Sequence, residues 1–236
     1  MASVLDRTAT FILRTAPPVV GIAVPLTLWA VFFWVPTDAG LGLSQRIFYY
    51  HMPAAVICFG AFAVAGASSI AYLRTTSSIW DHAASSAVAV GMLFATIALA
   101  TGSVWARTAW GTWWTWDTRL TTFLILWLLF AAYLLLRVLA RDNHMAPRFA
   151  AVLAIVGALN IPLVMMATRL WRTIHPQVVR NEAGGIRDPA MSATLLLCLA
   201  TFALLFAWLW ALRLRLAELE ESVEALSYHD PGRLVL

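Results

Sequence analysis

The sequence predicts an all-α membrane protein with six transmembrane helices, and its composition is the first observation behind this prediction. Of its 236 residues, 61% are hydrophobic and only 12% are charged, and the mean hydropathy is +0.79. Soluble domains contain about 45–50% apolar and about 25% charged residues, and one globule of this size cannot bury so much apolar surface. The composition therefore excludes a soluble enzyme, a disordered chain and a nucleic-acid-binding module. Helices are expected because a membrane span must satisfy its own backbone hydrogen bonds.

The second observation is a set of six apolar stretches with about the 20 residues that a helix needs to cross roughly 30 Å of hydrocarbon. The stretches are Val19 to Val35, Pro53 to Leu73, Ala83 to Thr101, Leu120 to Leu139, Phe149 to Thr168 and Met191 to Leu212. The first ends before Pro36, and the second starts at Pro53, which suits the first turn of a helix. The fourth is the clearest, because no charge interrupts LTTFLILWLLFAAYLLL. Pro162 predicts a kink in the fifth.

The third observation is the distribution of charge. All 16 basic residues are arginines, they form no basic run, and they lie between the apolar stretches, as expected for loops at a membrane surface. The side that carries both termini holds nine of them: Arg7, Arg14, Arg74, Arg137, Arg141, Arg148, Arg213, Arg215 and Arg233. The other side holds seven: Arg46, Arg107, Arg119, Arg169, Arg172, Arg180 and Arg187. The positive-inside rule favours cytoplasmic termini, and seven arginines on the exported side indicate a use for some of them there.

The chain is expected to form one membrane domain, residues 1–212, followed by a cytoplasmic C-terminal tail, residues 213–236. The exported loops are expected at residues 37–52, 102–119 and 169–190. In the tail, four apolar residues recur at helical spacing and predict a short amphipathic helix: Leu216, Leu219, Val223 and Leu226. The N-terminal segment shows no small-residue cleavage site after a short apolar region, so the first span is expected to be retained.

The loop between the third and fourth spans contains an unusual cluster of tryptophans. Five of the chain's twelve tryptophans fall within twelve positions: Trp105, Trp110, Trp113, Trp114 and Trp116. An aromatic belt at the headgroup region explains one or two of them. A set this dense offers a broad apolar surface with indole N–H donors at its edges, which suits a large planar ligand held at the membrane surface.

Two histidines lie beside membrane boundaries on the exported side. His51 stands at the start of the second span in RIFYYHMPAA, and His175 follows the fifth span in RLWRTIHPQVV. Each alone is interpreted as a solvated loop residue. Together they form a hypothesis, in which both imidazoles, free to orient in their loops, bind one iron from the same face. No His-x-x-x-His pair or carboxylate cluster indicates a zinc or di-iron site, and Cys58 and Cys198 form no CxxC pair.

Three charged residues lie close to these features. Asp117 directly precedes the fourth span, where it is expected to cap the helix and is able to orient a neighbouring group as well. Arg119 and Arg46 lie on the same side, and each is a candidate for binding an anionic group of a ligand. Lipid phosphate is the alternative partner for both arginines, and it is the favoured one for Arg169 and Arg172.

The segment WGTWWTWD, from Trp110 to Asp117, matches the tryptophan-rich WWD signature of haem-handling proteins in cytochrome c maturation. With its length, its six predicted spans and the histidines in YYHMPAA and TIHPQ, nearly the whole chain resembles the haem exporter protein C (CcmC) family. The larger haem lyases of the same superfamily have more spans and additional histidines inside them, whereas no histidine lies in the middle of a predicted span here.

The resemblance implies a site and a function. His51 and His175 would be the two axial ligands of the haem iron, and Asp117 the acid of the signature. Trp105, Trp110, Trp113, Trp114 and Trp116 would form the platform for the macrocycle, while Arg46 and Arg119 would neutralise the propionates. The cargo would be haem b, presented at the periplasmic face of the bacterial inner membrane to the haem chaperone CcmE for covalent attachment. The implied partners are the ABC transporter subunits CcmA and CcmB, the small protein CcmD and membrane lipid.

In this interpretation the chain is not an enzyme, since it works by positioning haem while a partner subunit hydrolyses ATP. Two alternatives remain. A quinone-binding membrane redox subunit would use the tryptophans for the quinone, but it needs an electron carrier that the spans do not provide. A plain transporter permease would carry intramembrane charges, and the predicted spans have almost none in their middles.

Overall fold

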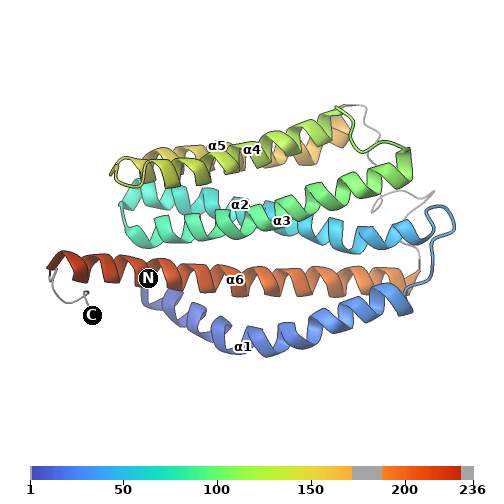
Figure 1. Cartoon of the computed structure of the whole chain (residues 1–236), viewed down its shortest axis with the longest axis horizontal. Coiled ribbons are helices and arrows are strands. Elements are labelled where there is room, and N and C mark those ends of the chain that lie inside the picture. The colour runs from blue at the N-terminus through green and yellow to red at the C-terminus, as the bar shows by residue number, and fades with distance from the viewer. Residues whose placement is uncertain (1, 172–187, 230–236) are drawn as a thin grey trace.

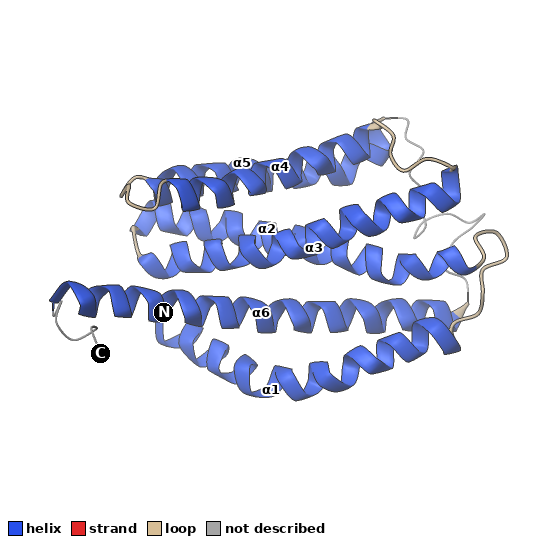
Figure 2. Ribbon diagram, viewed as in Figure 1, coloured by secondary structure: helices blue, strands red, loops and turns tan. Residues whose placement is uncertain are grey.

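The computed structural model describes residues 2–171 and 188–229, and these residues form six long helices without a β-strand (Figure 2). The helices are α1 (Ala2–Trp29), α2 (Phe48–Thr75), α3 (Ser78–Trp110), α4 (Thr118–Leu139), α5 (Ala146–Leu170) and α6 (Pro189–His229). A π-helical turn, Ala30–Trp34, extends α1, and a 3-10 turn, Leu43–Ile47, leads into α2. The predicted all-α architecture is confirmed.

The helices pack in three layers of two, and α2 lies near the centre (Figure 1). One layer is α4 with α5, the middle layer is α2 with α3, and the third is α1 with α6. The core between the first two layers is built on Phe62 and Phe130, whose rings stack with centroids 3.8 Å apart. Glycines make this stack possible, because a Cβ at Gly91 would lie 2.8 Å from the Phe62 ring and one at Gly157 would lie 2.7 Å from the Phe130 ring.

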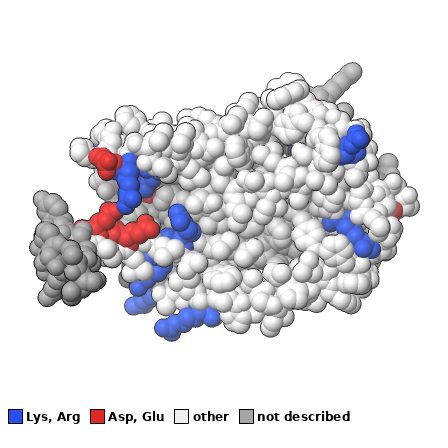
Figure 3. All heavy atoms as spheres, viewed as in Figure 1, with Lys and Arg blue, Asp and Glu red and all other residues white. Residues whose placement is uncertain are grey.

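All six helices are long and apolar enough to cross a membrane, which confirms six spans. The charged side chains in view gather at the two ends of the bundle, with an uncharged belt between them (Figure 3). The start of α1 and the end of α6 lie at the same end of the bundle (Figure 1), as an even number of spans requires. The opposite end carries the connection from α3 to α4 and, from here on, is called the site end.

The helices are longer than predicted, and two of the expected loops are therefore shorter. The loop predicted at residues 37–52 ends early, because α2 begins at Phe48 rather than near Pro53. Membrane-spanning helices tolerate an internal proline because neighbouring helices and local adjustments satisfy the freed backbone group. The loop predicted at residues 102–119 shrinks to residues 111–117, because α3 continues to Trp110 and ends at Gly111 (φ 77°), a left-handed cap. The third predicted loop, residues 169–190, begins within α5 and ends within α6. Residues 172–187 lie outside the described ranges.

The predicted tail helix is continuous with the last span, since α6 runs without a break from Pro189 to His229. No glycine or proline interrupts the sequence between those two residues, so the apolar span and the polar segment propagate as one helix. Four apolar residues of the predicted amphipathic face are exposed: Leu216, Leu219, Val223 and Leu226. On another face of the helix, Glu224 pairs with Arg141 at 2.8 Å and Glu221 accepts a hydrogen bond from Ser78 at 3.3 Å.

Candidate functional site

A pocket opens at the site end between α2, α3, α4 and the loop of residues 111–117. About 520 Å³ of space lies within it, and this volume includes open solvent at its mouth. Its walls are mainly apolar. The lining residues that can bind a ligand through a ring nitrogen, an indole or a positive charge are His51, Trp113, Trp114 and Arg119. The pocket thus combines one potential metal ligand, two indoles and one cation.

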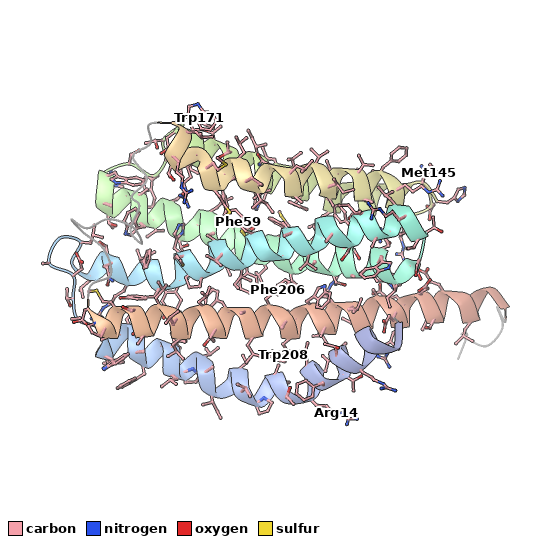
Figure 4. The ribbon with its side chains drawn as sticks, turned by 180° about the vertical axis from the view of Figure 1, so that it is seen from behind. Arg14, Phe59, Met145, Trp171, Phe206 and Trp208 are labelled. Atoms are coloured by element: carbon pink, nitrogen blue, oxygen red, sulfur yellow. The ribbon has the colours of Figure 1, made fainter. Side chains whose placement is uncertain are left out.

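Small residues of α3 leave room for this pocket. Ala98, Gly102 and Ala106 all line it, and their spacing of four residues places them on one face of the helix. The inner wall is closed by Phe59 of α2 and Phe123 of α4, which meet edge to face with ring centroids 5.7 Å apart. Figure 4 shows Phe59 on the side of α2 that faces the layer of α4 and α5. The space therefore arises from short side chains between two aromatic supports.

His51 is held by α3 as well as by its own helix. Its Nδ1 lies 3.0 Å from the carbonyl oxygen of Ala98 and 3.3 Å from Oγ1 of Thr101. A carbonyl only accepts, so the tautomer that fits this contact carries its proton on Nδ1 and keeps the lone pair of Nε2 for another partner. The prediction that the ring is free to orient is wrong for His51, because the residue is the fourth of α2 and its ring packs against α3.

The structure divides the five clustered tryptophans into two kinds. Trp105 and Trp110 belong to the last turns of α3 and pack edge to face, with centroids 5.1 Å apart. Trp114 and Trp116 in the loop make a second edge-to-face pair at 5.8 Å. Their interplanar angles are both 78°, so the cluster is not one flat surface. Trp113 and Trp114 line the pocket, and the buried Nε1 of Trp114 has no hydrogen-bond partner within the described residues.

The charged candidates also separate. Asp117 is the N-cap of α4, as predicted, and its Oδ1 accepts from the backbone N–H of Leu120 at 2.9 Å. Arg119 follows in the first turn of α4 and lines the same pocket as His51. Arg46 lies elsewhere, with its guanidinium carbon 5.9 Å from the centre of the Phe32 ring, and it is not among the residues that line the pocket. The structure therefore brings Arg119, but not Arg46, to the pocket with His51.

The other predicted ligand, His175, lies outside the described residues, as do Arg172, Arg180 and Arg187. Arg169 is in the last turn of α5. Ligation by His175 remains a prediction.

A family model described as "Heme exporter protein C" matches residues 3–229. The chain belongs to this family.

Its relatives include bacterial proteins and a mitochondrial protein. The Heme exporter protein C of Escherichia coli (strain K12) is 34% identical over 188 residues, which cover 80% of this chain and 76% of that protein. That of Bradyrhizobium diazoefficiens is 34% identical over 200 residues, covering 84% and 76%. A cytochrome c biosynthesis ccmC-like mitochondrial protein of Marchantia polymorpha is 30% identical over 192 residues, covering 80% and 82%. As a haem exporter protein C family member with six spanning helices, the chain is a multi-pass membrane protein of haem handling in cytochrome c biogenesis.

The sequence did not predict that residues of α3 would hold the ring of His51. Ala98, Thr101 and Gly102 contact the ring of His51, yet none of them stands out in an apolar span. The available signal was the spacing of small residues at positions 98, 102 and 106, which indicates a helix face that something approaches closely.

Proposed function

We propose that this chain binds haem b at the periplasmic face of the inner membrane and presents it to the haem chaperone CcmE for covalent attachment. In this proposal it acts within an ABC-type complex with CcmA, CcmB and CcmD. Family membership supports the haem-handling role, and one observation supports the location of the site. His51 and Arg119 line the same pocket, whose remaining walls are mainly apolar.

The pocket's chemistry fits haem better than a bare metal ion. A bare ion requires several protein ligands, and the described residues contain no group of three or more His, Cys, Asp or Glu side chains able to hold one. Haem brings its own four nitrogens and needs only axial ligands. His51 would supply one from Nε2, and His175 is the candidate for the other.

The rest of the cargo would be held by complementary groups. The apolar walls would cover part of the macrocycle, and Trp113, which is 58% exposed, would shield it at the mouth. Arg119 would pair with a propionate through charge-assisted hydrogen bonds. Arg46 would serve the second propionate only if that group extends beyond the pocket. Asp117 would act indirectly, since its capping bond fixes the first turn of α4, which carries Arg119.

The chain would work by positioning rather than by catalysis. With the iron fixed at His51 and a propionate at Arg119, the propionate edge of the macrocycle would be directed toward α4. The edge left at the mouth of the pocket is then available to the chaperone, which forms the covalent bond with a vinyl group. No side chain of the described pocket is required as an acid, base or nucleophile.

The test is the absorption spectrum and haem content of the purified protein beside those of His51→Ala, His175→Ala and the double variant. We expect a Soret band in the wild type that is lost in the double variant. His82→Ala is the matched control, because His82 lies in the first turns of α3 at the opposite end of the bundle. An unchanged spectrum in the double variant would overturn axial ligation by these residues.

A further inference from the structure

About one turn of α3 lies against the Nδ1 side of the His51 ring. The carbonyl of Ala98 and the hydroxyl of Thr101 face Nδ1, and the Cβ position of Gly102 faces Cε1 and the two ring nitrogens. We propose that Ala98, Thr101 and Gly102 are positioning residues that present His51 to the haem iron as a neutral, replaceable ligand. This inference rests on the proposed function.

The steric part of the argument depends on Gly102. A Cβ built on Gly102 would lie 2.9 Å from Cε1 of His51 and 3.3 Å from its Nδ1. The first distance is shorter than real Cβ contacts, and the neighbour is a ring whose backbone is fixed in α2. Any side chain at position 102 would therefore push the imidazole toward the pocket and change the direction of Nε2. Glycine at this position sets where the ring lies.

The hydrogen-bonding part depends on which atoms accept the Nδ1 proton. Oγ1 of Thr101 donates its own proton to the carbonyl of Ile97 at 2.6 Å, so its lone pairs are left to face Nδ1. The other acceptor is the Ala98 carbonyl. Both acceptors are neutral. They fix the tautomer, and therefore the donor atom Nε2, without adding negative charge to the imidazole.

The neutral acceptors have a consequence for ligand strength. A carboxylate bonded to the outer nitrogen of a metal-ligating histidine raises the basicity of the ligand, and changes at that partner typically alter metal affinity by about 10–100-fold. A carbonyl and a hydroxyl raise it less. A carrier that must give its haem to another protein needs an axial ligand that is oriented but can still be replaced on the iron. The contacts from α3 orient His51 without strengthening its bond to the iron as a carboxylate would.

The steric test compares two glycines of the same bundle. Gly102→Ala is expected to displace His51 and to lower haem retention at least tenfold. We also expect it to remove the low-spin spectrum of the bound haem, which is the result we expect for His51→Ala. Added imidazole should restore that spectrum, because a free ligand can occupy the vacated axial position. Gly60→Ala is the matched control, since Gly60 is inside α2 with open space around its Cβ position. Equal membrane levels and elution profiles of both variants exclude a general folding defect.

The hydrogen-bonding test changes only the acceptor at position 101. Thr101→Asp places a carboxylate near Nδ1, and we expect its haem to transfer to apomyoglobin at least tenfold more slowly, with a lower reduction potential. Thr101→Val keeps the Ala98 carbonyl and should change the transfer rate less than threefold, and Thr101→Ser should match the wild type.

The outcomes separate this inference from the proposed function. A wild type without a His51-dependent haem spectrum would overturn both. A His51-dependent spectrum that Gly102→Ala leaves intact would overturn the positioning role alone. If Thr101→Asp released haem as fast as the wild type, neutral acceptors would not be what makes the ligand replaceable.

Discussion

Arg119 allows the sharpest test of the pocket, because it is the cation placed there with His51. A hydrogen bond to a charged group contributes about 1.5–3 kcal/mol. Arg119→Leu keeps the apolar bulk of the side chain and removes the guanidinium. We therefore expect its dissociation constant for haem to rise about 10–100-fold, while protein levels in the membrane stay unchanged.

The assay is a spectroscopic titration of the apoprotein with haem and with haem dimethyl ester, whose propionates carry no charge. Arg119 should matter only when the propionate is charged, so wild type should prefer haem strongly and Arg119→Leu should bind the two compounds alike. Arg169→Leu is the matched control, because Arg169 lies in the last turn of α5 and is not among the residues that line the pocket, and its preference should remain that of the wild type. The same preference in wild type and Arg119→Leu would refute the pairing of Arg119 with a propionate.

Three further predictions concern the tryptophan cluster, the cap of α4 and two ion pairs at the opposite end of the bundle. Trp114→Ala should lower haem retention more than Trp208→Ala, because Trp208 lies between α6 and α1, away from the pocket (Figure 4); equal losses on haem quantification would reduce the cluster to an interfacial belt. Asp117→Ala should cost about 1 kcal/mol through loss of the helix cap and lower the thermal midpoint in detergent, and Asp117→Asn should recover most of it. Asp81→Ala breaks a partly buried pair with Arg137 (2.6 and 2.7 Å) and should destabilise by about 1.5–3 kcal/mol, whereas Arg141→Ala breaks an exposed pair and should cost less than about 1 kcal/mol; similar midpoints for the two variants would contradict this assignment.

The sequence predicts the spans well because membrane insertion depends on local composition. Five of the six predicted spans lie within a helix of the structure, and the first ends one residue beyond the π-helical turn that extends α1. The cap at Asp117 follows from a local rule. The ends of the helices are less predictable. Trp105 and Trp110 extend α3 beyond the apolar stretch, because a helix continues until a residue such as Gly111 ends it. In the same way, Arg213 and the residues after it continue α6.

The details of the site depend on contacts between helices that are far apart in sequence. His51 is recognisable as a boundary histidine, but its bond to Ala98 spans 47 positions and follows from how α2 packs on α3. Gly102 looks like an ordinary small residue of an apolar span until that packing brings an imidazole against it. Arg46 and Arg119 look equivalent in sequence, and only the turn before α2 and the start of α4 separate them.

The unbroken course of α6 gives the molecule a mechanical property. Its 41 residues make a rod about 60 Å long, twice the thickness of the hydrocarbon core, roughly 30 Å. Met191 at one end packs in a cluster with Tyr49, two positions before His51, and Glu224 near the other end pairs with Arg141. A rod of this length that tilts by about 5° around its centre moves each end by roughly 3 Å in opposite directions. A pull on the polar end of α6 would therefore reach the residues beside His51 on the far side of the membrane without any change in the helix itself.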